Sequence, residues 1–502
     1  MLSGLITNVA ISAVAFFAVS VVGLLIVPVL IGAYGLAGFG LIAIGRLFLP
    51  TTALAVLDLG YGEIATHSVA TSRVTGDWSG CARRLGLNVA VAGTVGLAAG
   101  IGLFTLASWI PGWCRVPAEH QPQLTEVLRV TAVLLPVLLC SLVAEGVLKG
   151  FESFGVQRLI EVVSALAYAG GALWAAGRGL DFHWVCYALL GSLLLRAGLA
   201  TGLAAWDLRA GQGTLARWTA TERGEFFQRA RGLFQSKLLG VAQAHSPSFL
   251  ITILFGPVAL GAFDALSRMP RFAKSVLGLL SSTVQPVAAR LEQLTDEQGL
   301  ARLGRLGLIL VAAIAAPVLG LAVAFSEPLL RVWLGPDISS LWGWQAAYFI
   351  GPTLGALVSF GGSALLGRMS ALAAMNRASL VNVAVIVFAG LALSPWLSER
   401  AFIASQVAAA LVSVPWHLSI IAREIGLQRT TFFTVARIYA ISLLLALPVV
   451  LVVHRVGSPV ILVLAMAGWT IVCWMICLGI GLPASLRARV VSTLAARLRA
   501  RP

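Results

Sequence analysis

Fourteen runs of apolar residues, each long enough to form a membrane-spanning helix, succeed one another along the chain. About 20 residues in an α-helix cross the hydrocarbon core of a bilayer. The runs cover residues 9–34, 37–59, 84–110, 124–148, 158–177, 183–206, 230–255, 258–290, 302–325, 341–366, 376–395, 401–421, 435–453 and 459–482. We therefore expect an all-α polytopic membrane protein with about 14 transmembrane helices.

A short internal repeat indicates how these helices are grouped. Residues 31–40 resemble residues 255–264 at an offset of 224, with matches between Gly32, Leu36, Phe39 and Gly256, Leu260, Phe263. Six predicted helices separate the two segments, and an even number gives both repeats the same topology. The predicted fold is two pseudo-symmetric six-helix lobes plus two C-terminal helices. The expected domains are an N-terminal lobe at 1–208, a second lobe with a preceding cytoplasmic linker at 209–430, helices thirteen and fourteen at 431–482, and a basic cytoplasmic tail at 483–502.

Composition strengthens the membrane assignment. The chain is 59% hydrophobic and only 11% charged, whereas soluble domains carry about 25% charged residues. Its net charge of +15 comes from 35 Lys and Arg against 20 Asp and Glu. With the N-terminus in the cytoplasm, 24 basic residues fall on the cytoplasmic side and 5 on the other, as the positive-inside rule requires. This bias predicts two cytoplasmic termini and makes nucleic acid an unnecessary partner.

Basic residues inside apolar runs are the strongest functional signal. Arg46 lies in the second run, and Arg268, Arg271 and Lys274 lie in the eighth. A charge in the core of a bilayer costs about 2.5–3.5 kcal/mol on insertion scales, so it usually serves a function. We expect these four residues to line a cavity that receives an anionic group. The structural alternatives are a pair between Asp264 and Arg268 one helical turn apart, and a pair between Arg46 and a buried carboxylate of its own lobe.

Buried acids are candidate sites for a coupling ion, H⁺ or Na⁺, because a desolvated carboxylate binds either one. Four acidic residues meet this description: Asp58, Asp264, Glu145 and Glu161. For Glu145 and Glu161, the alternative is an ion pair with Lys149 and Arg158 at the membrane surface. Arg196, midway along the sixth run, is expected to be structural.

Asp58 also has a structural alternative. It precedes Gly60 and Gly62, and an acid before glycines commonly ends a helix. The sequence leaves open whether Asp58 binds an ion or shapes the backbone.

Several short motifs, in order along residues 25–375, resemble those of bacterial O-antigen and polysaccharide flippases. They are Pro-Val-Leu-Ile-Gly at 28–32, Gly-Phe-Gly-Leu at 38–41, Leu-Asp-Leu-Gly-Tyr-Gly-Glu-Ile-Ala at 57–65, Gly-Val-Leu-Lys-Gly-Phe-Glu-Ser-Phe at 146–154, Leu-Phe-Gly-Pro-Val-Ala-Leu-Gly-Ala-Phe at 254–263 with Gln285-Pro286, and Leu-Leu-Arg-Val-Trp-Leu-Gly-Pro at 329–336. That family belongs to the multidrug/oligosaccharidyl-lipid/polysaccharide exporter superfamily. The resemblance implies a two-lobe bundle that moves undecaprenyl-diphosphate-linked O-antigen or exopolysaccharide units from the cytoplasmic to the periplasmic leaflet by alternating access.

Related lipid II flippases carry cavity arginines on the first, second and eighth helices. By resemblance, Arg46 fills the second-helix role, and Arg268 or Arg271 fills the eighth-helix role. The first run here has no basic residue, which makes lipid II a poorer substrate. The resemblance also implies a bacterial inner-membrane location. The implied partners are lipid-linked oligosaccharide, membrane lipid, and the polymerase and other polysaccharide-assembly proteins.

Other functions are less well supported by the sequence. A multidrug or cation antiporter of the same fold would favour an acidic cavity, whereas this one is predicted to be cationic. A polytopic glycan polymerase or ligase would have a large periplasmic loop, and the outward loops predicted here are short. The sequence shows no nucleotide-binding loop, no catalytic constellation and no metal-ligand cluster. We therefore expect a transporter and not an enzyme, with no cofactor other than a coupling ion.

Overall fold

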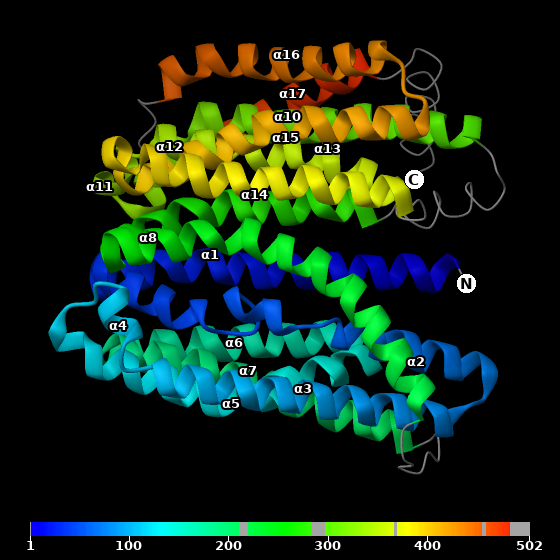
Figure 1. The fold of residues 1–502 in the computed structure, drawn as a ribbon. Coiled ribbons are helices and arrows are strands. Elements are labelled where there is room, and N and C mark those ends of the chain that lie inside the picture. The colour runs from blue at the N-terminus through cyan, green and yellow to red at the C-terminus, as the bar shows by residue number, and fades with distance from the viewer. Residues whose placement is uncertain (1, 210–218, 283–296, 366–368, 454–457, 482–502) are drawn as a thin grey trace, which may run out of the picture. The chain divides into compact units, whose positions relative to one another are not determined.

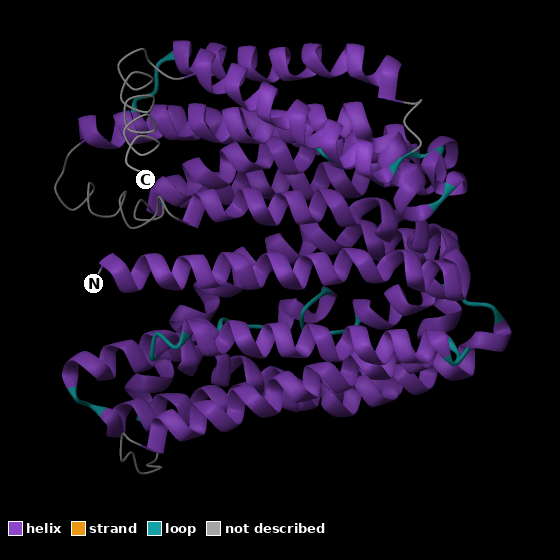
Figure 2. Ribbon diagram, turned by 180° about the vertical axis from the view of Figure 1, so that it is seen from behind, coloured by secondary structure: helices purple, strands orange, loops and turns teal. Residues whose placement is uncertain are grey.

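The structure, a computed structural model, describes residues 2–209, 219–282, 297–365, 369–453 and 458–481. Every regular element among these residues is a helix (Figures 1 and 2). Ten helical segments are long and apolar enough to cross a membrane. The expected all-α polytopic fold is thereby confirmed, whereas the predicted basic tail at 483–502 lies outside the described residues.

Each of the fourteen predicted runs coincides at least in part with a helix of the structure, and residues 283–290, 366 and 482 of these runs lie outside the described residues. The helices α1 (Leu2–Leu47) and α8 (Ala220–Ser282) and the segment Ala373–Ile425 each overlap two of the predicted runs, so the candidate spans are fewer and longer than the runs. The run predicted at 341–366 is divided into two shorter helices, Trp342–Tyr348 and Ile350–Ala364. The remaining runs correspond to one helix each.

The chain divides into two compact units, with the boundary between Ala265 and Leu266. The first unit contains α1 (Leu2–Leu47), the 3₁₀-helix Ala53–Leu57, α2 (Tyr61–Thr75), α3 (Trp78–Leu106), α4 (Ile110–Trp113), the 3₁₀-helix Ala118–His120, α5 (Gln121–Gly150), α6 (Phe154–Gly177), α7 (Phe182–Arg209) and most of α8 (Ala220–Ser282). The second contains the end of α8, α10 (Glu297–Leu334), α11 (Pro336–Ser339), α12 (Trp342–Tyr348), α13 (Ile350–Ala364), α14 (Met369–Leu397), the 3₁₀-helix Ser398–Arg400, α15 (Ala401–Ile425), α16 (Arg429–Val453) and α17 (Pro459–Gly481). The lobe boundaries expected from the sequence remain a prediction.

Two glycines break the longest helices into limbs. Gly35 in α1 has φ 66° and Gly256 in α8 has φ 80°, and both interrupt the helical backbone. Only glycine adopts such positive φ values without steric cost. Gly35, and not Gly32, is therefore the structural counterpart of Gly256. The sequence alignment of the repeat was out of register, because Gly32 lies within regular helix.

The second predicted run is shorter as a helix than expected. It was predicted over 37–59, but α1 ends at Leu47. Pro50 follows, and proline cannot supply a helical N–H donor. The Thr52 hydroxyl lies 2.6 Å from the carbonyl oxygen of Arg46 and 2.9 Å from that of Leu47, so its one proton can be donated to either carbonyl at the end of the helix. Arg46 consequently lies in the last turn of a helix and not in the middle of one.

Glycines permit close helix packing in the first unit, where α3 packs against α5 and α6 packs against α7 (Figure 1). A Cβ on Gly96 of α3 would lie 2.6 Å from the Cα of Pro136 on α5. One on Gly146 of α5 would overlap the carbonyl of Gly62 on α2, which also packs against α5. Small residues at such contacts are typical of membrane helices. In lipid the hydrophobic effect does not drive helices together, so their association depends on the dispersion energy gained by close approach.

In the second unit, α10 is the most buried candidate span and packs against α13, α16 and α17. The Ser442 hydroxyl on α16 donates to the Ala316 carbonyl at 2.7 Å, and the Tyr439 hydroxyl donates to the Thr353 carbonyl at 2.8 Å. The outward faces of α16 and α17 expose large apolar side chains, such as Leu451 and Val463. Such faces are compatible with lipid and not with water.

Candidate functional site

The backbones of α1 and α8 touch directly just after their two kinks. A Cβ added to Gly40 would overlap the carbonyl of Pro257, and one added to Gly261 would overlap the carbonyl of Leu36. The spacing from Leu36 to Pro257 is the same as from Gly40 to Gly261 and from Gly35 to Gly256. The contact is therefore reciprocal, and it gives the internal repeat a local twofold relation at this point in the first unit.

An ion pair lies one to two turns beyond this contact. The Nη2 of Arg46 on α1 donates to both carboxylate oxygens of Asp264 on α8, at 2.8 Å each. The Asp264 side chain is only 4% exposed, whereas that of Arg46 is 24% exposed. The cation is thus the accessible member of the pair. Pairing with a buried carboxylate was one of the alternatives for Arg46, but the acid comes from the second copy of the repeat.

The other predicted cavity cations follow Asp264 along α8. Arg268, Arg271 and Lys274 belong to the second unit. Arg268 and Arg271 are partly buried, and Lys274 is exposed. On an ideal helix, Asp264, Arg268 and Arg271 share one stripe and Lys274 lies off it. The assignment of these residues to a substrate cavity remains a prediction.

A second charged network joins α5, α6 and α7 in the first unit. Arg196 holds Glu145 through two hydrogen bonds, Nε to Oε1 at 2.6 Å and Nη2 to Oε2 at 2.8 Å. Its Nη2 also lies 3.5 Å from Glu161, which pairs with Arg158 at 2.5 Å. Two arginines thereby balance two glutamates. The Glu161–Arg158 pair is the one anticipated as the structural alternative, whereas the partner of Glu145 is Arg196 and not Lys149.

Asp58 organises the chain between α1 and α2. Its Oδ1 accepts the backbone N–H groups of Gly60 and Tyr61, both at 3.0 Å, at the start of α2. Its Oδ2 forms an ion pair with Lys237 of α8, which also pairs with Glu63 at 3.0 Å. Asp58 therefore ends the 3₁₀-helix Ala53–Leu57, as one reading of the sequence expected, and its side chain also stabilises the start of α2. The sequence did not indicate these contacts of Lys237, because its partners are remote along the chain.

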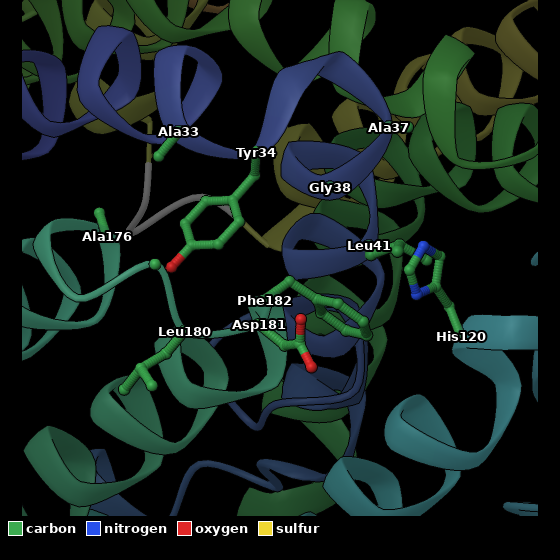
Figure 3. A pocket seen from close by; sticks show the side chains of 11 residues that line it. Ala33, Tyr34, Ala37, Gly38, Leu41, His120, Ala176, Leu180, Asp181 and Phe182 are labelled. Carbon is green, nitrogen blue, oxygen red and sulfur yellow. The ribbon is translucent and has the colours of Figure 1, made fainter.

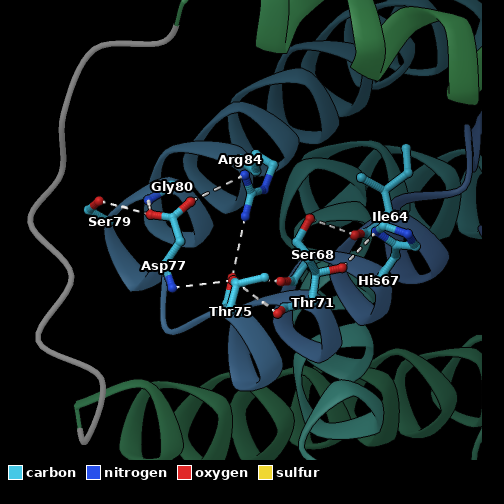
Figure 4. Close-up of polar contacts among 10 residues, drawn as sticks. Ile64, His67, Ser68, Thr71, Thr75, Asp77, Ser79, Gly80 and Arg84 are labelled. Carbon is cyan, nitrogen blue, oxygen red and sulfur yellow. Dashed lines mark hydrogen bonds and ion pairs between the residues drawn. The ribbon is translucent and has the colours of Figure 1, made fainter.

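The turn between α2 and α3 is fixed by a polar cluster (Figure 4). Asp77 caps α3 by accepting the N–H of Gly80 at 2.8 Å, and Arg84 donates to the Ser72 hydroxyl at 3.3 Å. The Gly80 hydrogen bond, with help from Ser79, holds the pKa of Asp77 below its ordinary value. This turn belongs to a basic segment that the charge bias assigns to the cytoplasm.

Solved structures with a similar fold are membrane transporters. The lipid II flippase MurJ in its inward closed conformation matches 93% of this chain and 97% of its own, with a TM-score of 0.70 and 14% identity. An inward-facing multidrug resistance MATE family transporter of the MOP superfamily matches 82% and 98%, with a TM-score of 0.66 and 14% identity. The MATE transporter VcmN of Vibrio cholerae in its bent form matches 84% and 95%, with a TM-score of 0.56 and 12% identity. The chain thus has the fold of this class of transporters.

The sequence itself identifies the family. The profile of the family described as "Polysaccharide biosynthesis protein" matches residues 90–340, which is half of the chain, and the chain belongs to that family. No curated protein sequence matches significantly. The family and the fold together confirm the resemblance stated above and make the protein a multi-pass transporter of the flippase type.

Proposed function

We propose that the protein flips an undecaprenyl-diphosphate-linked oligosaccharide, the repeat unit of an O-antigen or exopolysaccharide, from the cytoplasmic to the periplasmic leaflet of the bacterial inner membrane. The family match and the flippase-type fold support the general activity. The observation that carries the choice of an anionic lipid is the pair between Arg46 and Asp264, in which a partly exposed guanidinium is held by a buried carboxylate.

The diphosphate headgroup is the part of this substrate that cannot cross the bilayer unaided, because its charges would be desolvated. A guanidinium matches phosphate oxygens in a bidentate arrangement. In the proposed cycle, the diphosphate takes the place of Asp264 on Arg46. Arg46 then no longer neutralises the buried Asp264 carboxylate, and the loss of a charged partner in a buried site is costly. A proton or Na⁺ at Asp264 would compensate for that loss and would couple ion entry to substrate binding.

The contact between Gly40 and Pro257 lies beside this pair and closes one end of the α1–α8 interface in the first unit. Alternating access requires this contact to open when the headgroup leaves toward the periplasm. Breaking the Arg46–Asp264 pair removes one of the interactions that hold the two limbs together. Substrate binding and opening are linked in this way.

The proposed activity is tested in proteoliposomes that contain a fluorescent undecaprenyl-diphosphate-linked oligosaccharide. We expect the wild-type protein to accelerate exposure of the sugar to a membrane-impermeant oxidant. Arg271→Ala should slow this roughly 10- to 100-fold, the loss of one charge-assisted interaction, and Arg271→Lys should restore part of the rate because charge remains without the fork. Arg400→Ala is the matched control, since Arg400 pairs only loosely with Glu399 at 3.8 Å.

Two results would reject the proposal. One is a wild-type rate no higher than that of protein-free vesicles. The other is normal flipping in Arg271→Ala and Arg46→Ala alike. Uptake of an organic cation such as ethidium, without flipping, would assign the protein to cation export.

Ion coupling at Asp58 is a separate proposal, tested in the same vesicles. Lys237 occupies the position on Asp58 that a coupling cation would take. Asp58→Asn keeps the acceptor for the N–H groups of Gly60 and Tyr61 but loses the charge. We expect this variant to stall if an ion displaces Lys237 during the cycle. Wild-type rates that are insensitive to both pH and Na⁺ would remove ion coupling at every candidate acid.

A further inference from the structure

A pocket of 280 Å³ lies in the first unit, apart from the Arg46–Asp264 pair (Figure 3). Its walls come from α1, from the 3₁₀-helix Ala118–His120 and from the turn between α6 and α7. Tyr34, His120, Asp181 and Phe182 line it. This volume is close to the lower end of the range of about 300–1,000 Å³ that is typical of small-molecule sites.

Local sequence signals build this pocket. Gly179 has φ 65° and ends α6 in a left-handed conformation, with the N–H of Gly179 bonded to Ala176 and the N–H of Leu180 bonded to Ala175. This is the glycine-terminated cap that directs a chain away from a helix end. It leaves Asp181 and Phe182 at the wall of the pocket, immediately at the start of α7.

The polar groups of the pocket are oriented by a short chain of hydrogen bonds. Gln123 donates from Nε2 to Oδ2 of Asp181 at 3.1 Å, and its Oε1 lies 3.3 Å from Nδ1 of His120. The His120 ring meets the Phe182 ring edge to face, with centroids 5.7 Å apart. The Tyr34 hydroxyl is buried without a hydrogen-bond partner among the described residues. An unsatisfied buried hydroxyl is unfavourable, and a hydrogen bond to a ligand oxygen would remove that cost.

We propose that this pocket binds a single sugar ring of the translocated oligosaccharide. A carboxylate, a hydroxyl and an imidazole beside aromatic rings suit a ligand with an apolar face and several hydroxyl groups. None of the described residues that line the pocket is Lys or Arg, which disfavours the phosphates as its occupant. The proposal rests on the polysaccharide function for the choice of ligand, but the binding itself is measured independently of transport.

The position of the pocket supports its use during transport. Exposed tryptophans gather at this end of the first unit: Trp109, Trp113, Trp174 and Trp184. Tryptophans concentrate where a membrane protein crosses the lipid headgroups, so the pocket lies at the level at which a headgroup sugar enters or leaves. The charge bias assigns this end to the periplasm.

The pocket also lies next to the contact between Gly40 and Pro257, which opens in the proposed cycle. Ala37, Gly38 and Leu41 line it from the limb of α1 after the kink, whereas Leu36 and Gly40 present a different face of that limb to α8. A sugar in the pocket would thus press on the limb that closes against α8. A bound sugar can therefore favour one position of the part of α1 that follows the kink at Gly35.

The test uses full-length protein in nanodiscs of phosphatidylethanolamine and phosphatidylglycerol, with saturation-transfer NMR suited to weak ligands. The probes are methyl α-glucopyranoside, the methyl glycoside of N-acetylglucosamine and, as a cation, tetraethylammonium. We expect saturable binding of at least one glycoside. Tyr34→Phe should weaken it roughly three- to tenfold, the equivalent of one hydrogen bond, and Asp181→Asn should weaken it more.

Tyr34→Phe removes a hydroxyl without a partner, so the fold should tolerate it and the melting temperature should not fall. Tyr187→Phe is the matched control, because the Tyr187 hydroxyl is also buried but does not line the pocket. Equal glycoside signals in wild type, Tyr34→Phe and Asp181→Asn would overturn the proposal, as would their absence from the wild type. Binding of tetraethylammonium alone, lost in Asp181→Asn, would assign the pocket to a cationic ligand instead. Neither glycoside contains lipid or diphosphate, so a failure here is distinct from a failure to flip.

Discussion

The Arg46→Ala variant is expected to accumulate poorly in the membrane, and the double variant Arg46→Ala/Asp264→Asn is expected to recover its level without recovering transport. Arg46 donates to both oxygens of a carboxylate that is 4% exposed. Removing one member of a buried ion pair destabilises a protein by about 3–5 kcal/mol, because the other charge remains buried. Asparagine at 264 removes that charge and keeps the side-chain shape. Thermal stability in detergent and surface polysaccharide, measured in parallel, separate the two effects.

The double variant decides between a structural and a substrate-binding Arg46. If Arg46 only neutralises Asp264, the double variant flips at the rate of Asp264→Asn alone once its level is restored. If Arg46 also binds the diphosphate, flipping stays low in spite of normal stability. Asp264→Asn alone serves as the comparison, because it keeps Arg46 and removes its carboxylate partner. A double variant that flips as fast as an active Asp264→Asn variant would therefore exclude Arg46 from the substrate site.

The Gly40→Ala substitution is expected to prevent the close contact between α1 and α8. In Gly40→Ala, the new methyl group would overlap the Pro257 carbonyl, and backbone cannot move aside as a flexible side chain does. Overpacking of this kind costs about 1–3 kcal/mol. We expect a lower melting temperature, faster hydrogen exchange in 36–47 and 257–265, and impaired flipping. Gly261→Ala should behave alike, because its contact with Leu36 is the reciprocal one.

Gly32→Ala is the matched control on the same helix. A Cβ there would meet nothing within 4 Å, and its backbone is helical. Alanine also has the higher helix propensity, so this variant should be as stable as the wild type or slightly more stable. Gly40→Ala and Gly32→Ala with the same melting temperature and transport rate would show that the limbs do not touch in the membrane.

The helical content was accessible from the sequence because it follows from local composition. Runs of apolar residues must form helices in a bilayer, where every backbone N–H and C=O has to be bonded within the segment. The repeat also revealed that the start of the second helix has a counterpart at the start of the eighth. Its register was wrong by the distance between Gly32 and Gly35, since composition alone does not distinguish a helical glycine from one with positive φ.

The partners of the charged residues could not be read from the sequence in the same way. Arg46 and Asp264 are 218 residues apart, and Lys237 is 179 residues from Asp58. The rule for helical pairs considers only neighbours one turn away, and it suggested Arg268 for Asp264. Helices that are distant in sequence supply partners that this rule does not consider. The structure places Arg46 and Asp264 together, while the substrate-binding role of both remains a prediction.

Two features of this chain follow from its amino-acid sequence alone: it spans a membrane many times, and basic charges lie within its apolar runs. Both are local consequences of side-chain hydrophobicity and charge. The helix breaks at Gly35 and Gly256, the contacts of Gly40 and Gly261 with opposing carbonyls, and the shared pocket of Tyr34, His120 and Asp181 became visible only in the folded chain. Those contacts depend on the shape complementarity of surfaces far apart in the chain, because in lipid close packing, and not the burial of apolar area from water, selects the neighbours of a helix.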